Sequence, residues 1–221
     1  MPPRCLAIFD HDGVLIDSLA MHSAAWVELG RRTGLPIDDA FVRRTFGMTN
    51  PSIFAEMPGP PIAAEKAKEY ADLKESCYRD LARGTVVLMP GVRELLDALS
   101  AAGVALAIGS SGVRSNLDLT VEECGLTGRF AAIASLEDIT RGKPDPEVFL
   151  VAAAKCGIEP SRCVVFEDAP VGIRAAKAAG MRAVGVGTTH PLADLTAAGA
   201  DEVVVDLVGY PVSALVARLA G

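Results

Sequence analysis

Acidic residues follow two short apolar runs of this chain, at the point where each run ends. Asp10 and Asp12 follow the first run, and Glu167 and Asp168 follow another. In an open sheet of parallel strands, side chains beyond the carboxyl ends of the strands converge, and carboxylates brought together there would repel one another without a cation. Oxygen ligands of this kind suit a hard cation, most simply Mg²⁺. The sequence therefore predicts a divalent-metal site.

Hydroxyl and ammonium groups are expected beside the same site. Ser110 and Ser111 follow a further apolar run, and Lys143 lies in a loop that precedes a helical stretch. Next to a metal ion, such donors could hold a phosphoryl group. Each residue alone has an ordinary explanation, because an aspartate after a strand often caps a helix and a lysine is often a solvated charge. Their common position at strand ends favours a phosphate site.

Six short apolar runs are predicted to be strands that are buried on both faces of a parallel sheet. They span residues 6–9, 104–108, 131–134, 164–166, 183–186 and 203–205. Helical patterns are predicted at residues 20–33, 63–81, 91–102, 145–156 and 170–179. The alternation of strands and helices from residue 91 onward predicts an α/β fold with right-handed crossovers.

The region from residue 18 to residue 85 interrupts this alternation, because it holds two helical patterns and no apolar run typical of a strand. The simplest interpretation is an α-helical cap inserted into a Rossmann-like core with a parallel sheet. We expect residues 1–17 and 86–221 to form the α/β core and residues 18–85 to form the cap.

Composition excludes several partners. The 221 residues carry a formal net charge of −7 and only 5% aromatic residues, so nucleic acid is an unsuitable ligand. No apolar stretch is long enough to span a bilayer, and the first residues lack the apolar region of a signal peptide. Five widely spaced cysteines predict reduced thiols. We expect a cytoplasmic protein without membrane contact, either monomeric or homodimeric.

Four segments together resemble the motifs of the haloacid dehalogenase superfamily, in the same order and over nearly the whole chain. They are DHDGVLIDS at 10–18, Ser110, RGKPDP at 141–146 and EDAPVGI at 167–173. The insertion resembles the small helical cap of the subgroup that contains phosphoglycolate phosphatase and β-phosphoglucomutase. The resemblance implies a Mg²⁺-dependent enzyme that acts on a small phosphorylated metabolite.

The same resemblance implies the catalytic roles of the first motif. Asp10 would be the nucleophile that forms an aspartyl-phosphate. Asp12 would protonate the leaving oxygen and then accept a proton from the attacking water. Haloalkanoate dehalogenases lack a carboxylate at the position of Asp12, because a halide leaves without a proton. The carboxylate here favours phosphoryl transfer.

Metal and phosphate ligands follow from the resemblance as well. Mg²⁺ would be held by Asp10, the backbone carbonyl of Asp12, and Asp168, and Glu167 would assist directly or through water. The phosphoryl oxygens would be held by Ser110, Ser111 and Lys143.

Cap residues are expected to select the substrate, and the candidates are His22, Lys74 and Asn50. His22 and Lys74 match positions in β-phosphoglucomutase, where the histidine aids proton transfer and the lysine can reach a phosphate. The alternative for both is an ordinary polar residue on a helix face. Trp26 lies on the same helix face as His22, and we expect it to pack rather than to contact substrate.

Two departures from the family pattern bear on function. The mutases have an arginine that grips a second phosphate near Asn50, and neither Arg43 nor Arg44 is in register with it. An asparagine supplies no cationic clamp, so a phosphatase is favoured over a mutase. His11 stands where an apolar residue is usual, and strand alternation predicts that it points away from the catalytic face.

The sequence therefore predicts a Mg²⁺-dependent phosphatase for a small metabolite of the sugar phosphate or phosphoglycolate type. One alternative is a phosphomutase that resembles β-phosphoglucomutase. Another is a non-catalytic binding module that retains the fold.

Overall fold

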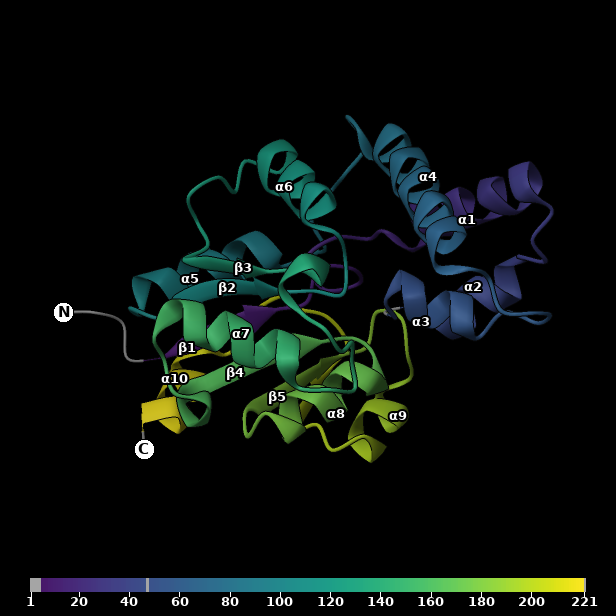
Figure 1. Cartoon of the computed structure of the whole chain (residues 1–221). Coiled ribbons are helices and arrows are strands. Elements are labelled where there is room, and N and C mark those ends of the chain that lie inside the picture. Colours follow the sequence, from purple (N-terminus) through teal and green to yellow (C-terminus); the bar gives the residue numbers. More distant parts are fainter. Residues whose placement is uncertain (1–4, 47, 221) are drawn as a thin grey trace.

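A computed structural model describes residues 5–46 and 48–220 of the chain. Its core is one sheet of six strands in the order β3-β2-β1-β4-β5-β6, and every neighbouring pair is parallel (Figure 1). The strands are β1 Leu6–Phe9, β2 Ala105–Gly109, β3 Ala132–Ala134, β4 Cys163–Glu167, β5 Arg182–Val186 and β6 Glu202–Val204. This confirms the predicted α/β fold, and each predicted strand agrees with an observed one to within about a residue at each end.

The register of the central strands aligns the positions where they end. Phe9, the last residue of β1, pairs with Ile108 of β2 on one side and with Phe166 of β4 on the other. The strand order also reverses at β1, since later strands are added on both of its sides. A crevice for ligands is expected beyond the strand ends at such a reversal.

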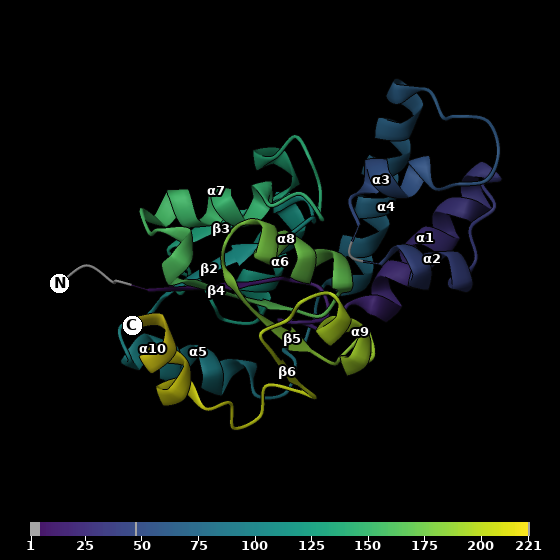
Figure 2. The same cartoon turned by 90° about the horizontal axis from the view of Figure 1, so that it is seen from below.

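Helices cover both faces of the sheet. One face is packed by α5 (Val92–Ala101), α6 (Arg114–Glu123) and α10 (Val212–Ala220). The other face is packed by α7 (Glu147–Cys156), α8 (Pro170–Ala178) and α9 (Leu192–Ala197). Figure 2 shows α7 and α8 on one side of the strands and α5 and α10 on the other. Alternate residues of each strand supply the two apolar layers, as a side-chain period of two requires.

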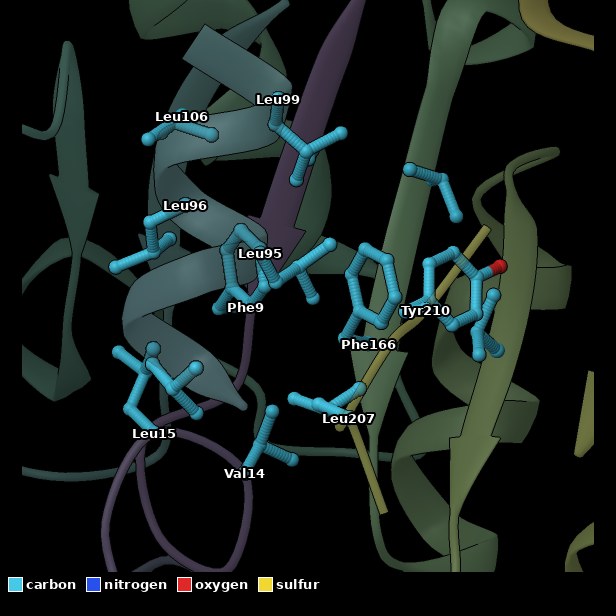
Figure 3. Packing of buried hydrophobic residues seen from close by; sticks show 14 of the residues in the cluster. Phe9, Val14, Leu15, Leu95, Leu96, Leu99, Leu106, Phe166, Leu207 and Tyr210 are labelled. Carbon is cyan, nitrogen blue, oxygen red and sulfur yellow. The ribbon is translucent and has the colours of Figure 1, made fainter. Parts of the chain in front are cut away.

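Aromatic side chains anchor the layer under α5. The Phe9 and Phe166 rings stack with centroids 4.8 Å apart, and Tyr210 meets Phe166 edge-on at 5.3 Å. Leu95 and Leu99 of α5 point from the helix toward these rings (Figure 3). This packing fixes the ends of β1 and β4, from which the acidic residues continue.

The described residues between β1 and α5 form four helices, which group at one end of the molecule (Figure 1). They are α1 Leu19–Thr33, α2 Asp39–Thr45, α3 Asn50–Ala55 and α4 Ala64–Ala82. They enclose an apolar cluster of their own, formed by Trp26, Leu29, Phe41, Val42, Ile53 and Phe54. All four helices lie within the predicted cap at 18–85, although the boundaries themselves remain a prediction.

Both connections between the helical segment and the core lie side by side. Ile16 and Leu88 form an isolated antiparallel bridge, and the Met89 amide donates to the Leu15 carbonyl at 2.9 Å.

In the part of the chain that the structure describes, no helix has the length and apolar character needed to cross a membrane.

Candidate active site

A cavity of about 490 Å³, a volume that includes space open to solvent, lies between the strand ends and the helical segment. Seven of the predicted site residues line it. They are Asp10, Asp12, His22, Asn50, Lys74, Ser110 and Ser111. The other three, Lys143, Glu167 and Asp168, are buried close to Asp10.

Backbone hydrogen bonds beyond the strands place the first of these residues. The Asp10 amide donates to the Phe166 carbonyl at 3.0 Å, and the Ser110 amide donates to the Ala134 carbonyl at 3.0 Å. After Asp12 the chain turns at Gly13, which has a φ of +79°. A β-carbon at Gly13 would collide with the Asp168 carboxylate, so glycine is required both for the turn and for the close approach.

Three buried carboxylates meet beside one lysine. One oxygen each of Asp10, Glu167 and Asp168 lies within 4.8 Å of the others. The Lys143 ammonium is 2.8 Å from Asp10 Oδ1 and 2.8 Å from Glu167 Oε2. The cluster therefore holds more negative than positive charge, and its four side chains are almost entirely buried.

The excess of negative charge alters the acidity of the cluster. Burial, together with the neighbouring Glu167, raises the pKa of Asp10 to about 7. Burial, Glu167 and Asp10 raise the pKa of Asp168 well above its ordinary value. Although burial opposes its charge, Asp10 and Glu167 together raise the pKa of Lys143, which therefore stays an ammonium.

These carboxylates fit a hard divalent cation. Protons or a cation must neutralise the excess charge, and Mg²⁺ prefers oxygen ligands of this kind. Glu167 is the least free of the three, because Lys143 holds its Oε2 and the Ala169 amide donates to its Oε1 at 3.1 Å. Asp168 is held in place by a short hydrogen bond from the Thr189 hydroxyl. Asp10 and Asp168 are thus the side chains best placed to bind an ion.

Asp12 has donors on one carboxylate oxygen. Its Oδ1 accepts from the Ser18 hydroxyl at 2.5 Å and lies 3.0 Å from His22 Nε2. His11 Nδ1 is 3.1 Å from the same oxygen. Although burial opposes ionisation, His11 and His22 hold the pKa of Asp12 well below its usual range. Its other oxygen, Oδ2, lies on the side of Gly112 and so faces the loop that contains Ser110 and Ser111.

The expectation that His11 points away from the catalytic groups is wrong. Its ring is fully buried between Asp12 and Thr120, whose hydroxyl is 2.8 Å from Nε2. The reason is that β1 ends at Phe9, so strand alternation no longer governs the residues after it. His11 nevertheless does not line the cavity.

The cap side of the cavity carries a buried polar chain of side chains. Lys74 Nζ is 2.8 Å from His22 Nδ1 and 2.9 Å from Glu75 Oε1. An ammonium only donates, so His22 Nδ1 accepts and the ring proton is on Nε2, where it faces Asp12. Asn50 Nδ2 donates to Glu75 Oε1 at 2.7 Å. The sequence analysis identified Lys74, His22 and Asn50 but not Glu75.

Asn116 is a second residue that the sequence analysis did not single out. It lies in the first turn of α6, and its Nδ2 donates to Glu75 Oε2 at 2.6 Å. Its Oδ1 accepts from Arg79 at 3.1 Å. One buried amide of the core thus joins two side chains of α4, and nothing in the local sequence of α6 predicts this pairing.

The remaining wall of the cavity is largely apolar. Trp26, Val42, Phe46, Met48 and Ile53 line it. Trp26 was expected to pack only, and it does pack edge-on against a phenylalanine of the cap, yet it also borders the cavity.

This combination defines the class of protein as an α/β enzyme with a polar site at the strand ends of its sheet. The sequence model of haloacid dehalogenase-like hydrolases matches residues 7–186. The chain therefore belongs to the haloacid dehalogenase-like hydrolase family, as its motifs predict.

Individual relatives share most of the chain. Validoxylamine A 7'-phosphate phosphatase of Streptomyces hygroscopicus subsp. limoneus is 35% identical over 91% of this chain and 93% of its own length. Beta-phosphoglucomutase of Bacillus subtilis is 32% identical over 90% of this chain and 92% of its own. Among solved structures, a hydrolase from Pseudomonas syringae superposes with a TM-score of 0.84 at 29% identity, covering 95% of this chain and 96% of that one.

Proposed function

We propose that the protein is a Mg²⁺-dependent cytoplasmic phosphatase that hydrolyses a small phosphorylated metabolite through an aspartyl-phosphate. The observation that carries the proposal is the meeting of Asp10, Asp168 and Lys143 at one edge of the cavity. Relatives named as phosphatases, among them the validoxylamine A 7'-phosphate phosphatase and hexitol phosphatase A of Escherichia coli, support the reaction class.

The residues present support a two-step displacement. In the first step a carboxylate oxygen of Asp10 forms a bond to phosphorus while the bond to the leaving oxygen breaks. Asp12, which must first take up a proton against the low pKa that His11 and His22 impose, gives that proton to the leaving oxygen. In the second step water attacks phosphorus, Asp12 takes the proton, and the bond between Asp10 and phosphorus breaks to release inorganic phosphate. Both aspartates return to their starting states.

Donors for the phosphoryl oxygens are available at the strand ends. Ser111 has a buried hydroxyl without a hydrogen-bond partner among the described residues, which is a free donor for a ligand. Lys143 supplies an ammonium beside Asp10. Mg²⁺, when bound by Asp10, Asp168 and the Asp12 carbonyl, would add positive charge at the phosphoryl oxygens. Such charge is the main requirement of phosphoryl transfer.

A phosphomutase is the second candidate, supported by the relationship to beta-phosphoglucomutase. It must also bind the substrate by a second phosphate. Neither Arg43 nor Arg44 lines the cavity, and Asn50 is engaged with Glu75. The cap side thus supports hydrolysis over isomerisation.

One assay separates these candidates. The protein is incubated with Mg²⁺ and β-glucose 1-phosphate, and both free phosphate and glucose 6-phosphate are measured. A phosphatase acting on this compound releases phosphate, whereas a mutase produces glucose 6-phosphate. Absence of phosphate release from a broad panel of phosphorylated metabolites would instead favour a non-catalytic binding module.

A further inference from the structure

The only lysine that lines the cavity among the described residues has its charge balanced by a carboxylate. Lys74 is 2% exposed and Glu75 is 6% exposed, and their charged atoms are 2.9 Å apart. Although burial opposes ionisation, Lys74 lowers the pKa of Glu75, which keeps it a carboxylate. The pair therefore adds no net charge to this side of the cavity.

Glu75 is also fixed in place. Asn50 donates to one of its oxygens at 2.7 Å, and Asn116 donates to the other at 2.6 Å. Lys74 uses two of its three protons on Glu75 and His22. Lys74 therefore keeps one proton to donate to a ligand, and the oxygens of Glu75 and Asn50 keep lone pairs that can accept from one. A ligand hydroxyl group can both accept and donate, so it matches both kinds of partner.

No described arginine lines the cavity to compensate a second anionic group. Arg44 lies 5.2 Å from the Phe41 ring centre, and Arg43 borders separate crevices. A carboxylate or a phosphate placed against Lys74 would lose its water and would meet the negative Glu75 as closely as the positive Lys74. Removing an unpaired charge from water costs far more than removing a hydroxyl that finds partners.

The apolar wall completes the surroundings of the leaving group. Trp26, Val42 and Ile53 offer carbon surface in the same cavity, and the Trp26 ring centre lies 5.3 Å from Lys74 Nζ. A polyol or sugar has both surfaces, because its C–H groups can pack on carbon while its hydroxyls bond to Asn50, Lys74 and Glu75.

From this geometry, and resting on the phosphatase function proposed above, we propose that the Lys74–Glu75 pair makes the enzyme selective for monophosphates of uncharged polyols or sugars. Glu75 is the specificity-determining residue. Substrates whose other end carries a carboxylate or a second phosphate are rejected, which excludes phosphoglycolate from the two classes that the sequence analysis left open.

Substrates of equal length test this selectivity in the unaltered protein. Glucitol 6-phosphate and 6-phosphogluconate differ only in the group at the end opposite the phosphate, a hydroxymethyl in one and a carboxylate in the other. With Mg²⁺ present, we expect kcat/KM for glucitol 6-phosphate to exceed that for 6-phosphogluconate by about 100-fold or more. Equal values, or a preference for 6-phosphogluconate, would overturn the inference.

Two variants with opposite effects assign the selectivity to the pair. Glu75→Gln keeps the shape but leaves Lys74 unbalanced, so the ratio of the two kcat/KM values should fall by about 10-fold. Lys74→Gln leaves Glu75 unbalanced, so the same ratio should rise. The matched control is Glu69→Gln, which removes the partner of Lys66 on the exposed face of the same helix and should not change the ratio. An unchanged ratio in both Lys74→Gln and Glu75→Gln would overturn the assignment.

A third substrate separates this inference from the proposed function. p-Nitrophenyl phosphate carries neither end group and reports phosphatase chemistry alone. Hydrolysis of p-nitrophenyl phosphate without discrimination between the other two overturns only the inference. No hydrolysis of any of the three overturns the proposed function and the inference together.

Discussion

Two buried lysines, Lys74 at the cavity wall and Lys143 next to the cavity-lining Asp10, have opposite electrostatic surroundings. Lys143 in the core faces Asp10 and Glu167, with Asp168 close by, so the carboxylates outnumber the ammonium. Lys74 in the cap faces the single carboxylate Glu75. The core cluster therefore has excess negative charge that protons or a cation must neutralise, whereas the Lys74–Glu75 pair is already balanced. The comparison teaches that two similarly buried lysines can differ in function through their surroundings: in the core carboxylates exceed the ammonium, whereas in the cap one carboxylate balances it.

Removal of the nucleophile is expected to have the largest effect. Asp10→Asn should lower kcat by about 10⁴-fold or more, because an amide cannot form the acyl phosphate. Phosphate release with Mg²⁺ measures it, and circular dichroism should show an intact fold. Asp72→Asn, which changes an exposed aspartate paired with Lys68, is the control and should keep full activity. Full activity of Asp10→Asn would remove Asp10 from this role.

Parallel lysine substitutions test the comparison directly. Lys143→Gln should lower kcat by about 10³-fold, because it removes the ammonium nearest to the transferred group. Lys74→Gln should lower kcat by no more than about 10-fold, since its charge is already balanced by Glu75. Steady-state kinetics on one substrate gives both values. Equal decreases in kcat in the two variants would contradict the proposal that the two lysines have different roles.

Metal binding should show a specific dependence on pH. The pKa of Asp10 in the folded protein is about 7, above its ordinary value of 3.8, so the folded state retains the proton and stability falls as pH rises between these values. Mg²⁺ neutralises the carboxylates once they are ionised. We expect saturating Mg²⁺ to raise Tm by about 5 °C at pH 8 and by clearly less at pH 5.

Differential scanning fluorimetry with and without Mg²⁺ measures this shift. Ca²⁺-free buffer and a chelator titration serve as the baseline. The same gain at both pH values would contradict the view that the carboxylate cluster binds the ion.

The smallest effect is expected where the core meets the cap. Asn116→Ala removes the amide that joins Glu75 to α6 and leaves a buried acceptor with one donor fewer. We expect a loss of about 1–2 kcal/mol in the free energy of unfolding and a KM increase of a few-fold with kcat nearly unchanged. Urea unfolding and kinetics measure both. Ser100→Ala, a substitution at an exposed residue of α5 that does not line the cavity, is a control for KM.

Much of the core could be predicted because its signals are local. The strands are short apolar runs, and the residues that follow them lie at one sheet edge as a consequence of parallel pairing. Helices α1 and α4 are long enough to show an apolar stripe. Helices α2, α3 and α9 have only six or seven residues, too few for periodicity to separate them from loops. Helices α6 and α10 are longer, at 10 and 9 residues, and were also missed.

The cap side of the site was less predictable for a different reason. Lys74 was identified by position, but its charge balance depends on Glu75, and the restraint on Glu75 depends on Asn116, which is 41 residues further along the chain. Such pairings arise only when separate helices pack. The predicted orientation of His11 was wrong for the same reason, because its surroundings are set by Thr120 of α6 rather than by its own strand.

The bridge between Ile16 and Leu88 has a consequence for how such a molecule can diversify. Because the chain leaves the core and returns to it at neighbouring points, the intervening helices are attached as if to a single stem. A shorter, longer or differently folded insert could be joined at the same stem without altering the order of the sheet. The residues at the strand ends could thus be inherited unchanged while the helical insert, which contacts the substrate, is exchanged as a unit.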